Sequence, residues 1–153
     1  MQLPPLLFIL SASFLICHVA SEDATLEANH LMNLLKQSID FQQFEAFHGF
    51  MSYEFTWDTC KKVLKFDDYI AMLKKMSAPT KGGWSPMSTD WTVTGAHFKD
   101  HALYFKIHNV NQKYAYYPDL HFEAKTVSRG NFDMTPNQYT LTRGKLGKCG
   151  PLE

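Results

Sequence analysis

The sequence lacks the features that mark several large classes of protein. Its 15 Lys and Arg side chains are balanced by 15 Asp and Glu, so it has no excess of positive charge to attract nucleic acid or anionic lipid. It contains no Asn-x-Ser/Thr sequon, no internal repeat and no low-complexity segment. We therefore expect no nucleic-acid partner, and no membrane partner for the mature form.

Long apolar segments are also scarce, and the one that stands out lies at the N-terminus. Residues 6–16 are apolar but too few to span a bilayer, and Ala20 and Ser21 follow as small residues suited to cleavage. This pattern predicts a signal peptide over residues 1–21, a mature domain over residues 22–153, and secretion to the extracellular space. A buried N-terminal helix is the alternative, against which we count Pro4 and Pro5.

Cysteine is rare, with three in the whole chain. Cleavage after residue 21 would remove Cys17 and leave Cys60 and Cys149. An even pair in an oxidising compartment is normally bridged. We therefore predict a disulfide between Cys60 and Cys149, with two unpaired buried thiols as the alternative.

The 153 residues are 45% hydrophobic, which suits one globular domain. Helical spacing predicts helices over residues 22–39, 40–49 and 66–76. We expect Asp40 to cap the second helix with Gln43 completing a capping box, and its three phenylalanines to face the sheet. These are Phe41, Phe44 and Phe47.

Alternation of apolar and polar residues predicts five strands. They cover residues 50–57, 91–98, 103–108, 120–125 and 138–142. In the first, Met51, Tyr53, Phe55 and Trp57 share the apolar side. One apolar face per strand is typical of an antiparallel sheet packed on one side. The fold class is therefore α+β, with the N-terminal helices covering the sheet.

The order of these elements resembles the nuclear transport factor 2-like superfamily, the cone-shaped α+β roll that includes SnoaL and ketosteroid isomerase. Locally, the chain is similar to small secreted members in nematodes. The matching residues are Asp40, Phe55-Thr56-Trp57, Cys60, the segment 66–70, and the basic segment 142–149 that ends in Cys149. The resemblance implies three helices on the concave face of a curved sheet and a cavity between them.

Enzymes of that superfamily perform acid–base chemistry in the cavity. The corresponding candidates here are His97, Tyr139 and Asp90, since His97 and Tyr139 share the apolar side of their strands and Asp90 precedes one. No spacing forces two titratable groups together, so an isomerase- or dehydratase-like enzyme is the alternative rather than the leading hypothesis. The histidines form no metal-binding motif, and we predict neither a metal nor a cofactor.

Binding is the leading functional hypothesis. Six aromatic residues are candidates to line a pocket for a small apolar ligand; the alternative is that they simply fill the core, as rings at these spacings usually do. They are Phe44, Phe55, Trp57, Trp91, Phe105 and Phe122. The other face of the sheet is rich in tyrosine and is a candidate surface for a homodimer or a protein partner. Its residues include Tyr104, Lys106, His108, Val110, Tyr114, Tyr116 and Tyr117.

Overall fold

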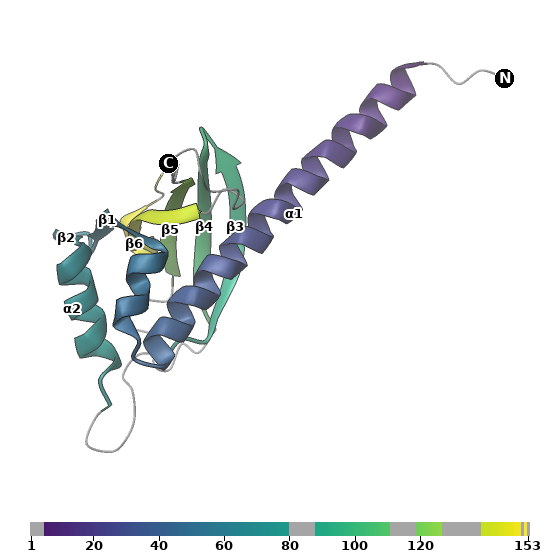
Figure 1. Cartoon of the computed structure of the whole chain (residues 1–153). Coiled ribbons are helices and arrows are strands. Elements are labelled where there is room, and N and C mark those ends of the chain that lie inside the picture. Colours follow the sequence, from purple (N-terminus) through teal and green to yellow (C-terminus); the bar gives the residue numbers. More distant parts are fainter. Residues whose placement is uncertain (1–4, 80–87, 111–118, 127–138, 151, 153) are drawn as a thin grey trace, which may run out of the picture.

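The computed structural model describes residues 5–79, 88–110, 119–126, 139–150 and 152, with side chains described from residue 23 onward. Helices pack against one curved sheet, which confirms the predicted α+β class (Figure 1). The elements are α1 (Pro5–Asp40), η1 (Phe44–Gly49), β1 (Met51–Asp58), β2 (Val63–Lys65), α2 (Phe66–Ser77), β3 (Trp91–Lys99), β4 (Ala102–Asn109), β5 (Asp119–Thr126), β6 (Tyr139–Leu146) and η3 (Gly147–Cys149). Both η elements are 3₁₀ helices.

The sheet has six strands in the order β2-β1-β6-β5-β4-β3. All neighbouring strands are antiparallel except β1 and β6, which are parallel. The five predicted strands are confirmed, while the three-residue β2 was not predicted because it is too short to show a period. The parallel pair brings the first strand of the domain beside the last.

Helix α1 is longer than predicted, since it begins at Pro5 rather than near residue 22. Proline is well suited to the first position of a helix, where its missing N–H has no partner to lose, so counting Pro5 against a helix was wrong. The predicted apolar stripe is confirmed, because all five members are at most 2% exposed: Ala24, Ala28, Leu31, Leu35 and Ile39. Among the helices of the described residues, none has the length and apolar character needed to cross a membrane.

Asp40 does not cap the second helix as predicted, because it is the last residue of α1. The residue before η1 is Gln43, whose side chain makes no capping hydrogen bond. Asp40 instead binds Lys36 at 2.9 Å and accepts a 2.5 Å hydrogen bond from the Thr89 hydroxyl. Lys36 also donates to the carbonyl oxygen of Thr89. The carboxylate therefore links the end of α1, through a hydrogen bond, to the residues that precede β3.

Two aromatic residues that were expected to be buried are exposed. Phe41 is 70% exposed, because α1 ends just before it and the chain turns at Gln42, whose φ is 56°. Tyr53 is 76% exposed and lies where the pairing of β1 with β6 is irregular, between Met51 and Thr56, whereas Phe55 and Trp57 after it are buried as predicted. The Tyr53 ring packs beside His48 and Phe66 instead.

A second irregularity divides β3. Its pairing with β4 shifts between Val93 and Gly95. A bulge of this kind inserts one residue and moves every later side chain to the opposite face. Val93 and Ala96 both pack against the core as a result, whereas alternation alone places them on opposite faces.

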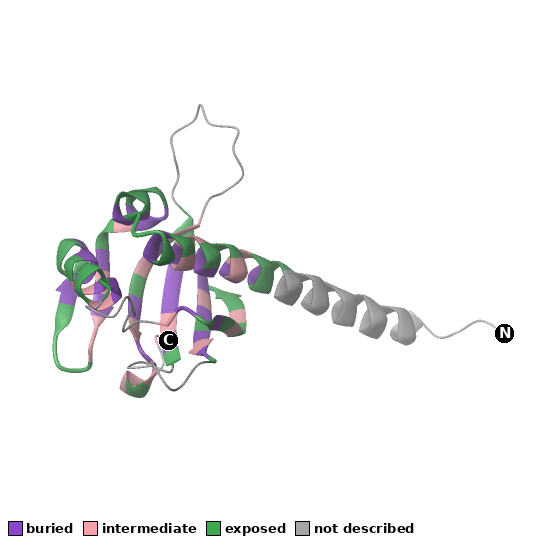
Figure 2. Cartoon of the chain, turned by 90° about the horizontal axis from the view of Figure 1, so that it is seen from below, coloured by how far each residue is buried: buried purple, intermediate pink, exposed green. Residues whose placement is uncertain are grey.

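The core lies between the helices and one face of the sheet. Figure 2 shows buried residues on the side of α1 that faces the strands, and on the strands beneath it. Strand β4 contributes Leu103, Phe105 and Ile107 to this interior, each at most 3% exposed. The three long side chains that alternate with them, Tyr104, Lys106 and His108, lie on the opposite face. We call that opposite side the open face.

Candidate functional site

The strand register defines the open face across four strands. In an antiparallel pair, residues directly opposite one another lie on the same face. His97 pairs with Tyr104, and Tyr104 with Glu123. In the next row, Lys106 pairs with His121, and His121 with Lys145. The open face is therefore polar and rich in cationic side chains, in contrast to the interior.

The interior face holds a continuous chain of five aromatic rings. Ring centroids lie 5.0 Å apart for Phe55 and Tyr69, 4.9 Å for Tyr69 and Trp57, 5.6 Å for Trp57 and Phe122, and 5.4 Å for Phe122 and Phe105. These separations are those of rings in contact. Four of the six predicted ligand-binding residues thus belong to one chain of ring contacts, in which Tyr69 joins Phe55 to Trp57. Along this chain the rings fill the space between the helices and the sheet.

The other two predicted ligand-binding residues lie apart from these rings. Phe44 stacks with Phe47 in η1, and the Lys74 ammonium lies 5.5 Å from its ring centroid. Trp91 begins β3, the edge strand on the far side of the sheet from β1. Both are buried. The six residues therefore belong to one hydrophobic core but not to one pocket.

The three candidate catalytic residues do not come together. The bulge in β3 places His97 on the open face, while Tyr139 contacts Phe98 on the helix side. Asp90 is exposed just before β3, seven residues from His97, which corresponds to about 23 Å along a strand. The pKa of Tyr139 is raised by burial and by Glu27 of α1. This environment keeps its hydroxyl protonated.

A pocket of about 150 Å³ lies on the open face. It is formed at the point where β3, β4 and β5 run side by side, and Leu152 of the C-terminal segment closes one side of it. The lining residues are Thr94, Gly95, His97, Tyr104, Phe105, Lys106, His121, Phe122 and Leu152. The rings of His97 and Tyr104 stack with centroids 5.7 Å apart, which gives the pocket a flat aromatic wall. Of the candidate catalytic residues, His97 alone belongs to it.

The electrostatics of the pocket centre on His121. Burial, Lys106 and Lys145 all lower the pKa of His121, and together they outweigh Asp119 and the backbone of Gly150, which raise it. The imidazole is therefore neutral at pH 7. Its Nδ1 is buried and has no hydrogen-bond partner among the described residues.

Next to the pocket, Glu123 is buried beneath a cluster of donors on the open face. Its carboxylate accepts hydrogen bonds from Arg143 and from the Thr142 hydroxyl at 3.0 Å, and Lys125 lies 3.3 Å away. Burial raises the pKa of Glu123, but the hydrogen bonds from Arg143 and Thr142 outweigh it and lower the pKa overall. Glu123 is thus ionised and fully engaged. The negative charge of this residue is already balanced by neighbours other than Lys106.

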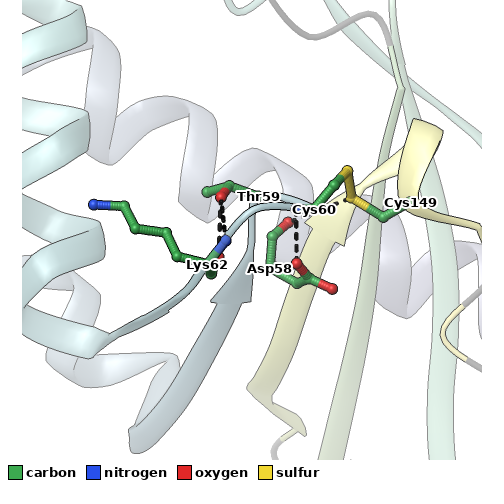
Figure 3. Close-up of a disulfide and its surroundings, with 5 residues drawn as sticks. All are labelled: Asp58, Thr59, Cys60, Lys62 and Cys149. Carbon is green, nitrogen blue, oxygen red and sulfur yellow. Dashed lines mark hydrogen bonds between the residues drawn. A yellow bond between two sulfur atoms is a disulfide. The ribbon is translucent and has the colours of Figure 1, made fainter.

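The C-terminal segment is attached to the sheet by the disulfide between Cys60 and Cys149, which confirms the predicted bridge (Figure 3). The two Cα atoms lie 5.3 Å apart and 89 positions apart in sequence. Cys60 lies in the turn between β1 and β2, where its φ of 67° is supported by a 2.7 Å hydrogen bond from its N–H to Asp58. The bridge holds the end of the chain at the sheet, and Leu152 follows three residues later.

The strand pattern predicted that Tyr104 and Lys106 belong to a surface, but it did not predict the pocket. Three features create it: the bulge that turns His97 outward, the cross-strand neighbours of Lys106, and the return of Leu152 to the sheet. A glycine in a strand is a known sign of a bulge, so Gly95 was the available signal. Tyr114, Tyr116 and Tyr117 lie outside the described residues.

No metal site is evident in the ranges described, since nowhere in them do three His, Cys, Asp or Glu side chains gather closely enough to hold an ion. His97 and His101 lie at the β3–β4 hairpin, where Asp100 and His101 both have positive φ values. Such values are typical of a tight two-residue hairpin turn. The open face thus offers basic and aromatic side chains together with the carboxylates of Asp119 and Glu123, which are paired with His108 and Arg143.

Comparison with known proteins bears on the fold. No family model and no curated protein sequence matches the chain. A solved structure whose name begins Rd1NTF2_05 superposes with a TM-score of 0.53 at 11% identity, covering 77% of this chain and 94% of that one. A conserved protein from Planctomyces limnophilus DSM 3776 gives a TM-score of 0.52 at 7% identity, covering 78% and 91%. The chain therefore has the nuclear transport factor 2-like fold.

Proposed function

We propose that the chain is a secreted, non-catalytic binding protein that holds a small, largely apolar ligand in the open-face pocket. The observation that carries this proposal is the pocket itself, in which a stacked aromatic wall lies beside the polar side chains of Thr94, Lys106 and His121. Apolar walls with a small number of placed polar groups are typical of ligand sites. The aromatic residues of the interior serve as the core, since their rings contact one another.

Secretion is supported by three features of the chain. Residues 6–16 have the length and apolar character of a signal peptide core. The Cys60–Cys149 disulfide is compatible with an oxidising compartment. The local sequence resemblance is to secreted nematode proteins. Expression of the full chain in a eukaryotic cell tests this part: we expect the protein in the medium with its N-terminus near residue 22, and retention of the uncleaved chain inside the cell would contradict it.

A thermal-shift screen tests the binding site. The panel consists of small aromatic and aliphatic compounds, and we expect some to raise the melting temperature of the wild-type protein. Tyr104→Ala and His97→Ala each remove part of the aromatic wall and should abolish the shift. Tyr53→Ala is the matched control, because Tyr53 is an exposed tyrosine on β1, away from the pocket. Shifts that survive both pocket variants would overturn the assignment.

A homodimer across the open face is a second candidate, favoured by the exposure of Val110, which is 64%. An apolar side chain beside aromatic and cationic ones is common at interfaces. Sedimentation velocity at increasing concentration tests it, since dimerisation would raise the sedimentation coefficient. Val110→Asp should abolish that increase, whereas a monomer at all concentrations would contradict the dimer.

A further inference from the structure

We infer that the open-face pocket recognises the carboxylate group of a small aromatic acid, with the charge bound at Lys106 and His121, beside Lys145, and the apolar body in contact with the stacked rings of His97 and Tyr104. This inference rests on the proposed function and names the class of its ligand. It follows from the basic side chains around the pocket. The size and the aromatic wall of the pocket do not by themselves indicate a charged ligand.

The three basic side chains form one row across three strands. Lys106 on β4 is the register partner of His121 on β5, and His121 is the register partner of Lys145 on β6. Directly opposed residues have Cα atoms about 4.5–5.5 Å apart. Because the imidazole of His121 is neutral, the positive charge of the row lies on its two lysines. An anion bound beside His121 would lie near that charge and be attracted by it.

Among the described residues, the acidic groups near the row are engaged with other partners. Asp119 lies 2.7 Å from Nδ1 of His108, and Glu123 is held by Arg143, Thr142 and Lys125. Within the described part of the chain, Lys106 makes no ion pair. The pocket therefore has a positive charge that its own carboxylates do not neutralise.

The protonation of His121 would change when an anion binds beside it. Its imidazole is neutral at pH 7 because burial and the two lysines lower its pKa, and its Nδ1 has no partner in the described residues. A carboxylate bound beside it would favour the protonated ring, which donates from both nitrogens. The facing charges are Lys106 and Lys145, which oppose protonation, and Asp119, which favours it.

The volume of the pocket suits a ligand built on one aromatic ring. A cavity of about 150 Å³ is known to accept benzene, and this pocket has about that volume. The stacked rings of His97 and Tyr104, only 20° from parallel, offer a flat surface to a second ring. A benzoate-sized acid therefore matches both the space and the charge.

Benzoate and its neutral isostere benzamide are suitable probes, used with the full mature protein with its disulfide intact. Titrations followed by ¹H–¹⁵N spectra should show benzoate perturbing the amides of Thr94, Gly95 and Lys106, and binding on the order of tenfold more tightly than benzamide. Benzoate should also raise the pKa of His121, measured from its ring proton shifts. Its affinity should then increase as the pH falls from 8 to 6.

Charge variants provide the controls. Lys106→Gln should weaken benzoate binding about five- to tenfold and leave benzamide binding unchanged. Lys65→Gln is the matched control, because Lys65 is an exposed lysine on β2, at the opposite edge of the sheet from β3. It should bind benzoate like the wild type.

The outcomes separate this inference from the proposed function. Equal affinity for benzoate and benzamide, with the pocket amides perturbed by both, would contradict recognition of the carboxylate group. The pocket would still be a ligand site. A loss of benzoate binding in Lys65→Gln equal to that in Lys106→Gln would contradict that recognition as well, since general attraction to a cationic surface would then explain the binding. If neither probe perturbs the pocket, the inference and the proposed site both fail.

Discussion

Buried charge on the open face is concentrated in one residue. The Glu123 side chain is 1% exposed, yet it is ionised because Arg143, Thr142 and Lys125 surround it. A buried carboxylate is stable only when its hydrogen-bonding capacity is satisfied in this way. The lowered pKa of Glu123 means that the folded protein stabilises the ionised carboxylate relative to the protonated form.

Glu123→Gln should destabilise the protein by about 2 kcal/mol at pH 7, because it removes the charge from hydrogen bonds that Arg143 and Thr142 donate. The stabilisation from a lowered carboxyl pKa is fully present above the unfolded-state pKa and is lost as the pH falls through the folded-state value. The difference between wild type and variant should therefore shrink in acid. Urea unfolding at pH 7 and pH 3 measures both effects.

Glu45→Gln is the control for this substitution, since the Glu45 side chain is 90% exposed, and we expect a change within about 0.5 kcal/mol. A Glu123→Gln variant as stable as Glu45→Gln at pH 7 would contradict the role given to the buried carboxylate.

Gly144→Ala should also destabilise the protein, by about 1–3 kcal/mol. A Cβ at this position would lie 2.6 Å from two Trp57 ring atoms and 3.0 Å from the Phe122 ring, in the middle of the aromatic core. At Gly95, in β3, a Cβ would meet nothing within 4 Å, so Gly95→Ala should preserve stability. Thermal unfolding of the two variants gives the comparison. Equal melting temperatures would show that the core around Trp57 is loosely packed.

At the level of secondary structure, the sequence predicted which elements exist better than it predicted their orientation. Periodicity found α2 and the five long strands, because a half-buried element repeats its apolar residues regularly. It failed at His97, where the bulge in β3 reverses the face of the side chains that follow, and at Tyr53, beside the irregular pairing of β1 with β6. Such irregularities depend on the partner strand, which a local pattern does not contain.

The end of α1 illustrates the same limit. Asp40 satisfies the local criteria for a helix cap, but its tertiary contact with Thr89 uses the carboxylate for a different purpose. We expect Asp40→Ala to destabilise the protein by about 1 kcal/mol. In a double-mutant cycle with Thr89→Val, the two effects should be clearly non-additive, because each variant removes the same hydrogen bond. Additive effects, measured by urea unfolding, would contradict a link between α1 and β3.

At the scale of the whole molecule, the disulfide joins the turn after β1 to the end of the chain. The general fold and this bridge were predictable from the sequence, because both follow from element order and cysteine count. The pocket was not, since it needs three strands and the C-terminal segment in register. Its residues are spread from Thr94 to Leu152.

Removing the bridge with Cys60→Ser and Cys149→Ser together should lower the free energy of unfolding by about 2–5 kcal/mol, because the 89-position loop is then unrestrained in the unfolded chain. Denaturant unfolding of the oxidised wild type and the double variant gives this value. Intact mass before and after reduction and alkylation verifies that the wild type is bridged. Equal stabilities would contradict the role of the bridge.

The central claim is that ligands bind in the open-face pocket and not among the interior rings of Phe55, Trp57 and Tyr69. Mapping amide and side-chain shifts on the ¹⁵N- and ¹³C-labelled protein, with whichever compound the thermal-shift panel identifies, tests it most directly. We expect the largest changes at Gly95, Lys106 and His121. Changes centred instead on Phe55, Trp57 and Tyr69 would contradict it and place the ligand inside the cone.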